Sequence, residues 1–131
     1  MKKGIIFSAL IIILCSFSGE QSLKGTWKFV GSMFNGKYDG PPKEYILQRQ
    51  YDDDKYDAYV LEPGQKPEKF ESGSYRIKGD TCYEIQTYSS QPSKLLNVRM
   101  KYSYIIRHDS LILHAKLPSG YYEDDYWKKV K

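Results

Sequence analysis

The feature that most constrains the fold of this chain is the alternation of apolar and polar residues with a period of two. Side chains on a β-strand point in turn to opposite faces, so apolar residues at every second position predict a strand with one buried face. No segment shows the 3.6-residue period of an amphipathic helix. The alternation is clearest in the segment 96–107, where one face carries Leu96, Val98, Met100, Tyr102, Tyr104 and Ile106.

Seven further segments show similar alternation or are rich in aromatic and β-branched residues, which favour pleated strands. Eight short strands at regular spacing predict an antiparallel barrel or sandwich. The seven segments are 23–31, 44–51, 55–62, 69–77, 81–88, 110–117 and 121–130. If Tyr83 and Ile85 point into such a barrel, Cys82 faces outward.

The connections between these segments favour a barrel over a sandwich. Short connections at 52–54, 78–80 and 108–109 alternate with longer ones, and every one of the 6 prolines falls in the longer set. Proline cannot donate a ladder hydrogen bond and therefore collects in loops. The alternation predicts an up-and-down meander with one end closed by hairpins and an open mouth at the other. A Greek-key sandwich would need long crossings at both ends. The longer connections are 34–43, 63–68, 89–94 and 118–120.

In this topology the first strand begins, and the last strand finishes, at the closed end. Trp27 and Trp127 then lie near each other, and Gly25 lets the backbone bend or pack closely beside them. We expect Trp27 to plug the closed end.

The first residues have the order of a secretory signal peptide. Lys2 and Lys3 precede an apolar run from Ile5 to Leu14, and small residues follow it. The run is about half the twenty residues of a membrane span. We therefore expect a signal peptide at 1–19 and an exported domain at 20–131, periplasmic or secreted, with no transmembrane span in the mature chain.

Cys15 leaves open a second way of processing the leader, as a lipoprotein signal. A lipoprotein signal is cut just before a cysteine that then carries acyl chains, which would anchor the domain to the envelope. Leu14 departs from the small residue that the lipoprotein peptidase prefers there. By either route Cys82 is the only thiol available to the domain core, so we expect no internal disulfide.

Charge and polar motifs exclude several functions. The 20 Lys and Arg are interleaved with 16 Asp and Glu, without the basic stripe of a nucleic-acid binder. Adjacent His108, Asp109 and Ser110 in a tight turn point to different faces and do not form a triad. His108 and His114 lack the spacing of a metal site. We expect no enzymatic activity, no metal and no cofactor.

Three features together resemble the lipocalin (calycin) group: Gly25-Thr26-Trp27 on the first strand, the eight-strand meander, and the ending Tyr-Trp-Lys-Lys-Val at 126–130. More narrowly, the pattern is similar to small exported lipocalin-like domains of unknown function from Bacteroidetes. The resemblance covers residues 22–131 and implies a shallow ligand-binding barrel without a known ligand. It also implies that a basic side chain, here Lys129 or Lys128 in place of the usual arginine, packs over Trp27.

Two hypotheses for the function follow. The first is a binding module for a small apolar or amphipathic ligand at the barrel mouth, with Phe34 and Tyr38 on a candidate lid. If Trp127 faces inward, Glu123 and Asp125 share that side and contact polar atoms of the ligand. The alternative is a protein-interaction or enzyme-inhibitor module whose barrel is filled by its own side chains; the sequence sets no oligomeric state. The candidate ligand-binding residues are Phe29, Tyr45, Tyr75, Met100, Tyr102, Tyr104 and Leu113.

Overall fold

Nine β-strands and no helix make up residues 22–130, the part of the chain that this computed structural model describes. The predicted signal peptide at 1–19, with Cys15, lies outside the described residues. Within 22–130 there is no helix with the length and apolar character of a membrane span. The strands are β1 (Gly25–Phe34), β2 (Lys37–Asp39), β3 (Ile46–Tyr51), β4 (Lys55–Leu61), β5 (Glu68–Lys78), β6 (Thr81–Ser89), β7 (Arg99–Arg107), β8 (Ser110–Lys116) and β9 (Tyr122–Lys129).

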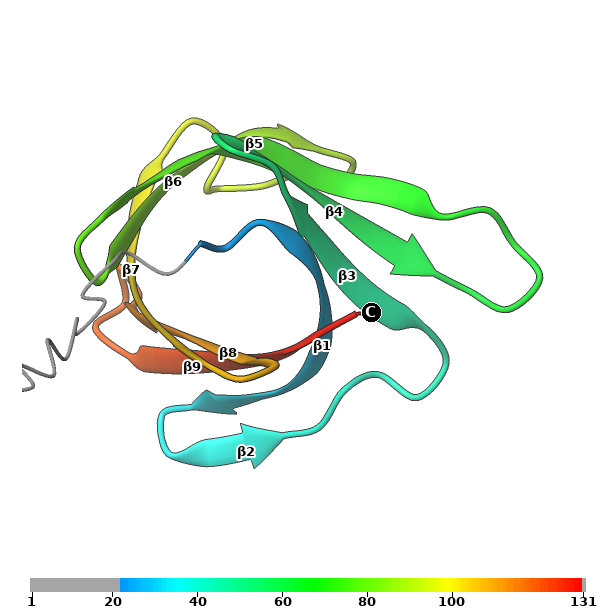
Figure 1. The fold of residues 1–131 in the computed structure, drawn as a ribbon, viewed down its shortest axis with the longest axis horizontal. Helices are drawn as coiled ribbons and strands as arrows, with labels where there is room; N and C mark the ends of the chain where they lie inside the picture. The colour runs from blue at the N-terminus through cyan, green and yellow to red at the C-terminus, as the bar shows by residue number, and fades with distance from the viewer. Residues whose placement is uncertain (1–21, 131) are drawn as a thin grey trace, which may run out of the picture.

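Eight of these strands form a closed antiparallel barrel. From β3 to β9 each strand pairs with the next in sequence, and β1 pairs with both β3 and β9. The pairing of Trp27 with Arg49 on one side and with Lys129 on the other closes the ring. Figure 1 shows the ring seen along its axis, with β2 outside it. The predicted up-and-down barrel is confirmed.

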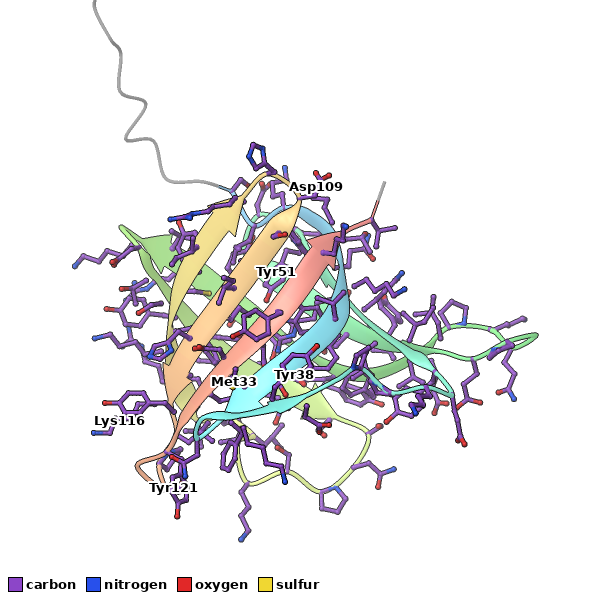
Figure 2. All side chains as sticks on the ribbon, turned by 90° about the horizontal axis from the view of Figure 1, so that it is seen from below. Met33, Tyr38, Tyr51, Asp109, Lys116 and Tyr121 are labelled. Carbon is purple, nitrogen blue, oxygen red and sulfur yellow. The ribbon has the colours of Figure 1, made fainter. Side chains whose placement is uncertain are left out.

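The two ends of the barrel differ in the way that the connections predict. The tight turns after β3, β5 and β7 meet at the end where β1 begins. In Figure 2, Asp109 marks this closed end, and Lys116 and Tyr121 mark the opposite, open end. The longer connections, which follow β4, β6 and β8, lie at the open end.

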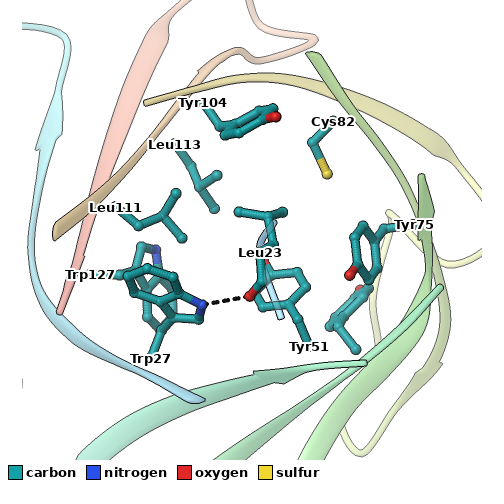
Figure 3. Packing of buried hydrophobic residues seen from close by; sticks show 10 residues of the cluster. Leu23, Trp27, Tyr51, Tyr75, Cys82, Tyr104, Leu111, Leu113 and Trp127 are labelled. Atoms are coloured by element: carbon teal, nitrogen blue, oxygen red, sulfur yellow. Dashed lines mark hydrogen bonds between the residues drawn. The ribbon is translucent and has the colours of Figure 1, made fainter. Parts of the chain in front are cut away.

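A cluster of aromatic and aliphatic side chains fills the closed half. Leu23, just before β1, turns into the barrel and is 1% exposed. Its carbonyl accepts a hydrogen bond from the indole Nε1 of Trp27 at 2.8 Å, which satisfies the polar atom of a side chain that is itself 1% exposed. Figure 3 shows Leu23 at the centre of this cluster. The other members are Tyr51, Tyr56, Tyr75, Cys82, Tyr104, Leu111, Leu113 and Trp127.

Lys129 crosses the closed end over Trp27. Its Nζ lies 4.9 Å from the centre of the indole ring and donates to the carbonyl of Lys24 at 2.9 Å. A side chain at Gly25 would block this path, because a Cβ there would lie 2.8 Å from Cε of Lys129. The backbone of Gly25 also has a φ of 123°, which disfavours any other residue.

The seventh strand begins later than the alternation predicts. Leu96 and Val98, predicted to face inward, are 43% and 39% exposed. Asn97 between them has a φ of 60°, and its N–H donates to the carbonyl of Gln86. This left-handed residue interrupts the extended backbone, so the alternation of apolar residues there belongs to a loop and β7 starts at Arg99.

The inward face of β6 is the opposite of the one predicted. Cys82 and Glu84 are 1% and 3% exposed inside the barrel. Tyr83 faces outward, where the guanidinium groups of Arg76 and Arg99 lie 5.5 and 4.7 Å from its ring centre. The two arginines cover the ring of Tyr83 on the outer surface, which explains how the outer face of β6 carries a tyrosine. The inward face of β6 carries a glutamate in its place.

The predicted lid is instead an added strand. Residues Lys37–Asp39 pair with the second half of β1 as β2 and do not cross the mouth (Figure 1). The ring of Tyr38 lies against Gly31, where a Cβ would come within 2.5 Å of its hydroxyl. Phe34 packs edge-on against Tyr121 at 5.5 Å. These contacts hold the hairpin against the outside of the barrel.

Candidate functional site

A cavity of about 260 Å³ lies in the barrel above the core cluster. Trp127 and Leu113 belong to both, so these two side chains lie where the core cluster meets the cavity. Six of the nine strands contribute to its wall, which combines apolar and charged side chains. The apolar and aromatic part is Phe29, Leu47, Phe70, Tyr102, Leu113 and Trp127, and the charged part is Arg49, Glu71, Glu123 and Asp125.

Arg49 on β3 points into the barrel and organises the charged part of the wall. Its side chain is 11% exposed, and its Nη2 lies 2.8 Å from Oε1 of Glu84 and 3.2 Å from Oε1 of Glu71. Burial alone would lower the pKa of the guanidinium, but the carboxylates of Glu84 and Glu71 raise it well above its usual value. Arg49 therefore carries a permanent positive charge that the two carboxylates partner from β5 and β6.

Tyrosine side chains extend the network of Arg49, Glu71 and Glu84 toward the core cluster. Nη1 of Arg49 donates to the hydroxyl of Tyr51 at 2.7 Å, and the hydroxyl of Tyr56 donates to Glu71 at 2.8 Å. The guanidinium also lies 4.4 Å from the ring centre of Tyr56. Gly73 makes room for this ring, because a Cβ at Gly73 would lie 2.7 Å from it. The network joins the filled core to the cavity wall.

Glu123 and Asp125 lie on the same inward side of β9 as Trp127. They line the cavity as the alternation predicts for an inward Trp127. Burial, and then the neighbouring charge and hydrogen bond of Glu123, raise the pKa of Asp125 to about 7. Asp125 is therefore partly protonated at neutral pH, and Glu123 shares this proton through a hydrogen bond.

The raised pKa of Asp125 predicts a pH-dependent gain in stability for Asp125→Asn. The folded protein binds a proton that the unfolded chain releases between about pH 4 and 7, so the contribution of Asp125 to stability falls as the pH rises through this range. The amide of the variant carries no charge. We expect its free energy of unfolding to exceed that of the wild type by about 1–3 kcal/mol at pH 8 and to match it near pH 4.5.

Urea unfolding of both proteins at the two pH values measures this difference. Asp124→Asn is the matched control, because Asp124 lies on the outer face of the same strand and pairs there with His114. The control should show no gain at pH 8. An equal effect of Asp125→Asn at both pH values would contradict the shared proton.

A second hollow lies outside the barrel wall, where β1 and β3 separate. It measures about 480 Å³, and Phe29 and Leu47 line both this outer hollow and the cavity. The pairing of β1 with β3 ends at Lys28 and Gln48, which opens the wall at this point. The other lining residues of the outer hollow are Lys28, Pro41, Pro42, Lys43, Glu44, Tyr45, Ile46, Leu61, Glu62 and Pro63.

The structure brings together only some of the predicted ligand-binding residues. Phe29, Tyr102 and Leu113 line the cavity, Tyr45 lines the outer hollow, and Met100 is buried on β7. Tyr75 and Tyr104 lie in the core at the closed end instead of the mouth. Their hydroxyls donate to the backbone carbonyls of Asp52 and Gly79. Each of these tyrosines ties a strand to a closed-end turn.

Sequence reasoning missed Arg49, Glu71 and Glu84. The signal for Arg49 is present in the segment 44–51, where the face of Leu47 and Tyr51 has an arginine between two apolar residues. A charge at an inward position of a strand predicts an inward partner of opposite charge. The partners lie 22 and 35 residues away along the chain, so only the barrel register identifies them.

The histidines form no shared site. His108 lies in the turn at the closed end, and His114 lies on the outer face of β8, stacked on Tyr122 at 5.4 Å. Across residues 22–130 no group of three histidine, cysteine or acidic side chains is arranged to hold a metal ion. Burial raises the pKa of Cys82 to about 12, which keeps its thiol protonated at neutral pH.

Similarity to known proteins is found in structure and not in sequence. No protein-family model and no curated protein matches the chain. A solved structure of a lipocalin-like protein from Bacteroides uniformis matches it with a TM-score of 0.59 and 16% identity, covering 82% of this chain and 98% of that one. The fold is lipocalin-like.

Two mutants of the fluorescent protein UnaG match this lipocalin-like barrel less closely. Their TM-scores are 0.43 and 0.42 at 15% and 14% identity, over 82% and 83% of this chain and 96% of each of theirs. The match to the Bacteroides uniformis structure confirms, at the level of the fold, the resemblance to a lipocalin-like domain.

Proposed function

We propose that this protein is an exported, non-enzymatic module that binds a small amphipathic molecule in the open half of its barrel. The observation that carries the proposal is the cavity above Trp127. The closed half is filled by the protein's own side chains, whereas the open half has space next to both aromatic and charged groups. Export is inferred from the sequence pattern at residues 1–19.

The wall chemistry suits a ligand with an apolar body and a few polar atoms. Phe29 and Trp127 meet edge-to-face at 5.3 Å and form an apolar surface beside Leu113. Small-molecule sites combine such surfaces with a small number of fixed polar groups. A cavity of about 260 Å³ is slightly below the usual range for drug-sized ligands. The ligand is therefore small or extends into the outer hollow past Phe29 and Leu47.

Titration with 1-octanol tests this proposal with a neutral probe. We expect binding with a dissociation constant of about 0.1–1 mM, given the modest binding energy available to a ligand of this size. Trp127 should report it as a change in tryptophan fluorescence, and isothermal calorimetry should measure the affinity. Leu47→Ala removes apolar contact inside the cavity and should weaken binding about fivefold.

Leu61→Ala is the matched control, because Leu61 lies on the neighbouring strand and lines only the outer hollow. It should leave the affinity within about twofold. A larger loss with Leu61→Ala than with Leu47→Ala would move the site to the outer hollow. No binding up to the solubility limit would favour the protein-interaction or enzyme-inhibitor module.

A further inference from the structure

The charges in the cavity do not balance. Its wall holds the carboxylates of Glu71, Glu123 and Asp125 but a single cationic side chain, Arg49. Arg49 already pairs with Glu71 and with Glu84 below it. The open half of the barrel therefore has an excess of negative charge before any ligand enters.

Glu123 and Asp125 carry this excess. None of the ion pairs among residues 22–130 includes either of them. The adjacent strands add no charge beside them, since Asp125 has Ser32 opposite on β1 and Leu113 opposite on β8. The titratable or charged groups that act on Asp125 or share its cavity are Arg49 on β3, Glu71 on β5, Tyr102 on β7, and Glu123 and Asp124 on β9. Glu84 on β6 contacts Arg49 instead.

Aromatic rings line the same cavity. Phe29 and Trp127 present π-systems, which attract an ammonium group in addition to their apolar contact. Two carboxylates on one strand do not supply the six or more oxygen ligands that a calcium ion needs.

We infer that the cavity selects a cationic amphipath, an organic amine whose ammonium group contacts Asp125 and Glu123 while its apolar body lies against Phe29, Trp127 and Leu113. This inference rests on the proposed function and specifies the ligand class. Buried carboxylates without a cation favour a ligand that supplies one.

Proton balance gives the inference a measurable signature. Below about pH 7 Asp125 holds a proton, and an ammonium ion that binds there releases this proton to solvent. Asp125 has a pKa of about 7, whereas an alkylamine, like a lysine side chain, stays charged to about pH 10. We therefore expect the affinity for an alkylamine to rise from pH 5.5 to pH 8.5. The affinity for a neutral ligand should not rise over this range.

Three eight-carbon probes that differ only in their head group test the inference. At pH 8 we expect octylamine to bind at least tenfold more tightly than 1-octanol and octanoate to bind most weakly. Asp125→Asn should weaken octylamine binding about tenfold, so that the preference of the cavity for octylamine over 1-octanol is largely lost. Asp124→Asn, which removes the same charge from the outer face of the strand, should change neither.

The outcomes separate this inference from the proposed function. If 1-octanol binds but octylamine binds no better, or if octanoate binds best, the cation site is wrong and the binding module stands. Equal losses with Asp125→Asn and Asp124→Asn would also overturn it, as would octylamine affinity that does not change with pH. If none of the three probes binds, both proposals fail.

Discussion

Replacing Arg49 with methionine is expected to lower the free energy of unfolding by about 3–5 kcal/mol, because it leaves a buried carboxylate without its partner. Glu84 is 3% exposed and lies 2.8 Å from the guanidinium. The long apolar side chain of methionine retains most of the packing volume of arginine. The loss in the free energy of unfolding therefore measures the effect of removing the positive charge. Urea unfolding at pH 8 measures it.

Two further variants separate this effect from simple truncation. The double variant Arg49→Met with Glu84→Gln removes the unpaired charge and should recover a large part of the loss. Lys69→Met removes the cation of an exposed pair, which lies 3.3 Å from Asp57, and should cost less than about 0.5 kcal/mol. A loss for Arg49→Met as small as that of Lys69→Met would show that the interior network contributes little.

Trp27→Ala is expected to cost a similar amount, about 3–5 kcal/mol, for a different reason. The ring is 1% exposed at the closed end, between Leu23 inside and Lys129 above it. Its removal leaves a cavity, an unpaired carbonyl at Leu23 and an ammonium group without its aromatic surface. Thermal and urea unfolding measure the loss.

Phe34→Ala is the control for removing an aromatic ring, because Phe34 is 43% exposed and contacts Tyr121 on the outer surface. Its cost should stay below about 1 kcal/mol. A cost for Trp27→Ala in the same range would mean that the closed end is not held by this side chain.

The barrel was predictable from the sequence because its two determinants are local. Strand alternation and the short and long connections are visible without any knowledge of long-range contacts. The pairing of β1 with β9 was predicted correctly because the first and last strands of a closed up-and-down meander are neighbours. The prediction failed where a single residue changes the backbone, as at Asn97, whose left-handed conformation delays the start of β7 to Arg99.

The candidate site was less predictable because it depends on which face of each strand points inward. On β6 the aromatic Tyr83 suggested the wrong face, and Glu84 was missed with it. The inward position of Glu84 is stabilised by Arg49, 35 residues earlier in the chain. By contrast, Glu123 and Asp125 share a strand with Trp127, so the inward tryptophan was enough to place both.

Leucine methyl NMR during a titration with 1-octanol tests most directly whether the open half of the barrel binds a ligand. Leu47 lines the cavity and Leu113 lies where the cavity meets the core cluster, whereas Leu23 and Leu111 belong to the core cluster alone. We predict saturable shifts of the Leu47 and Leu113 methyl signals, with little change at Leu23 and Leu111. Unchanged Leu47 and Leu113 signals up to the solubility limit, or shifts confined to leucines outside the cavity, would contradict a ligand site inside the barrel.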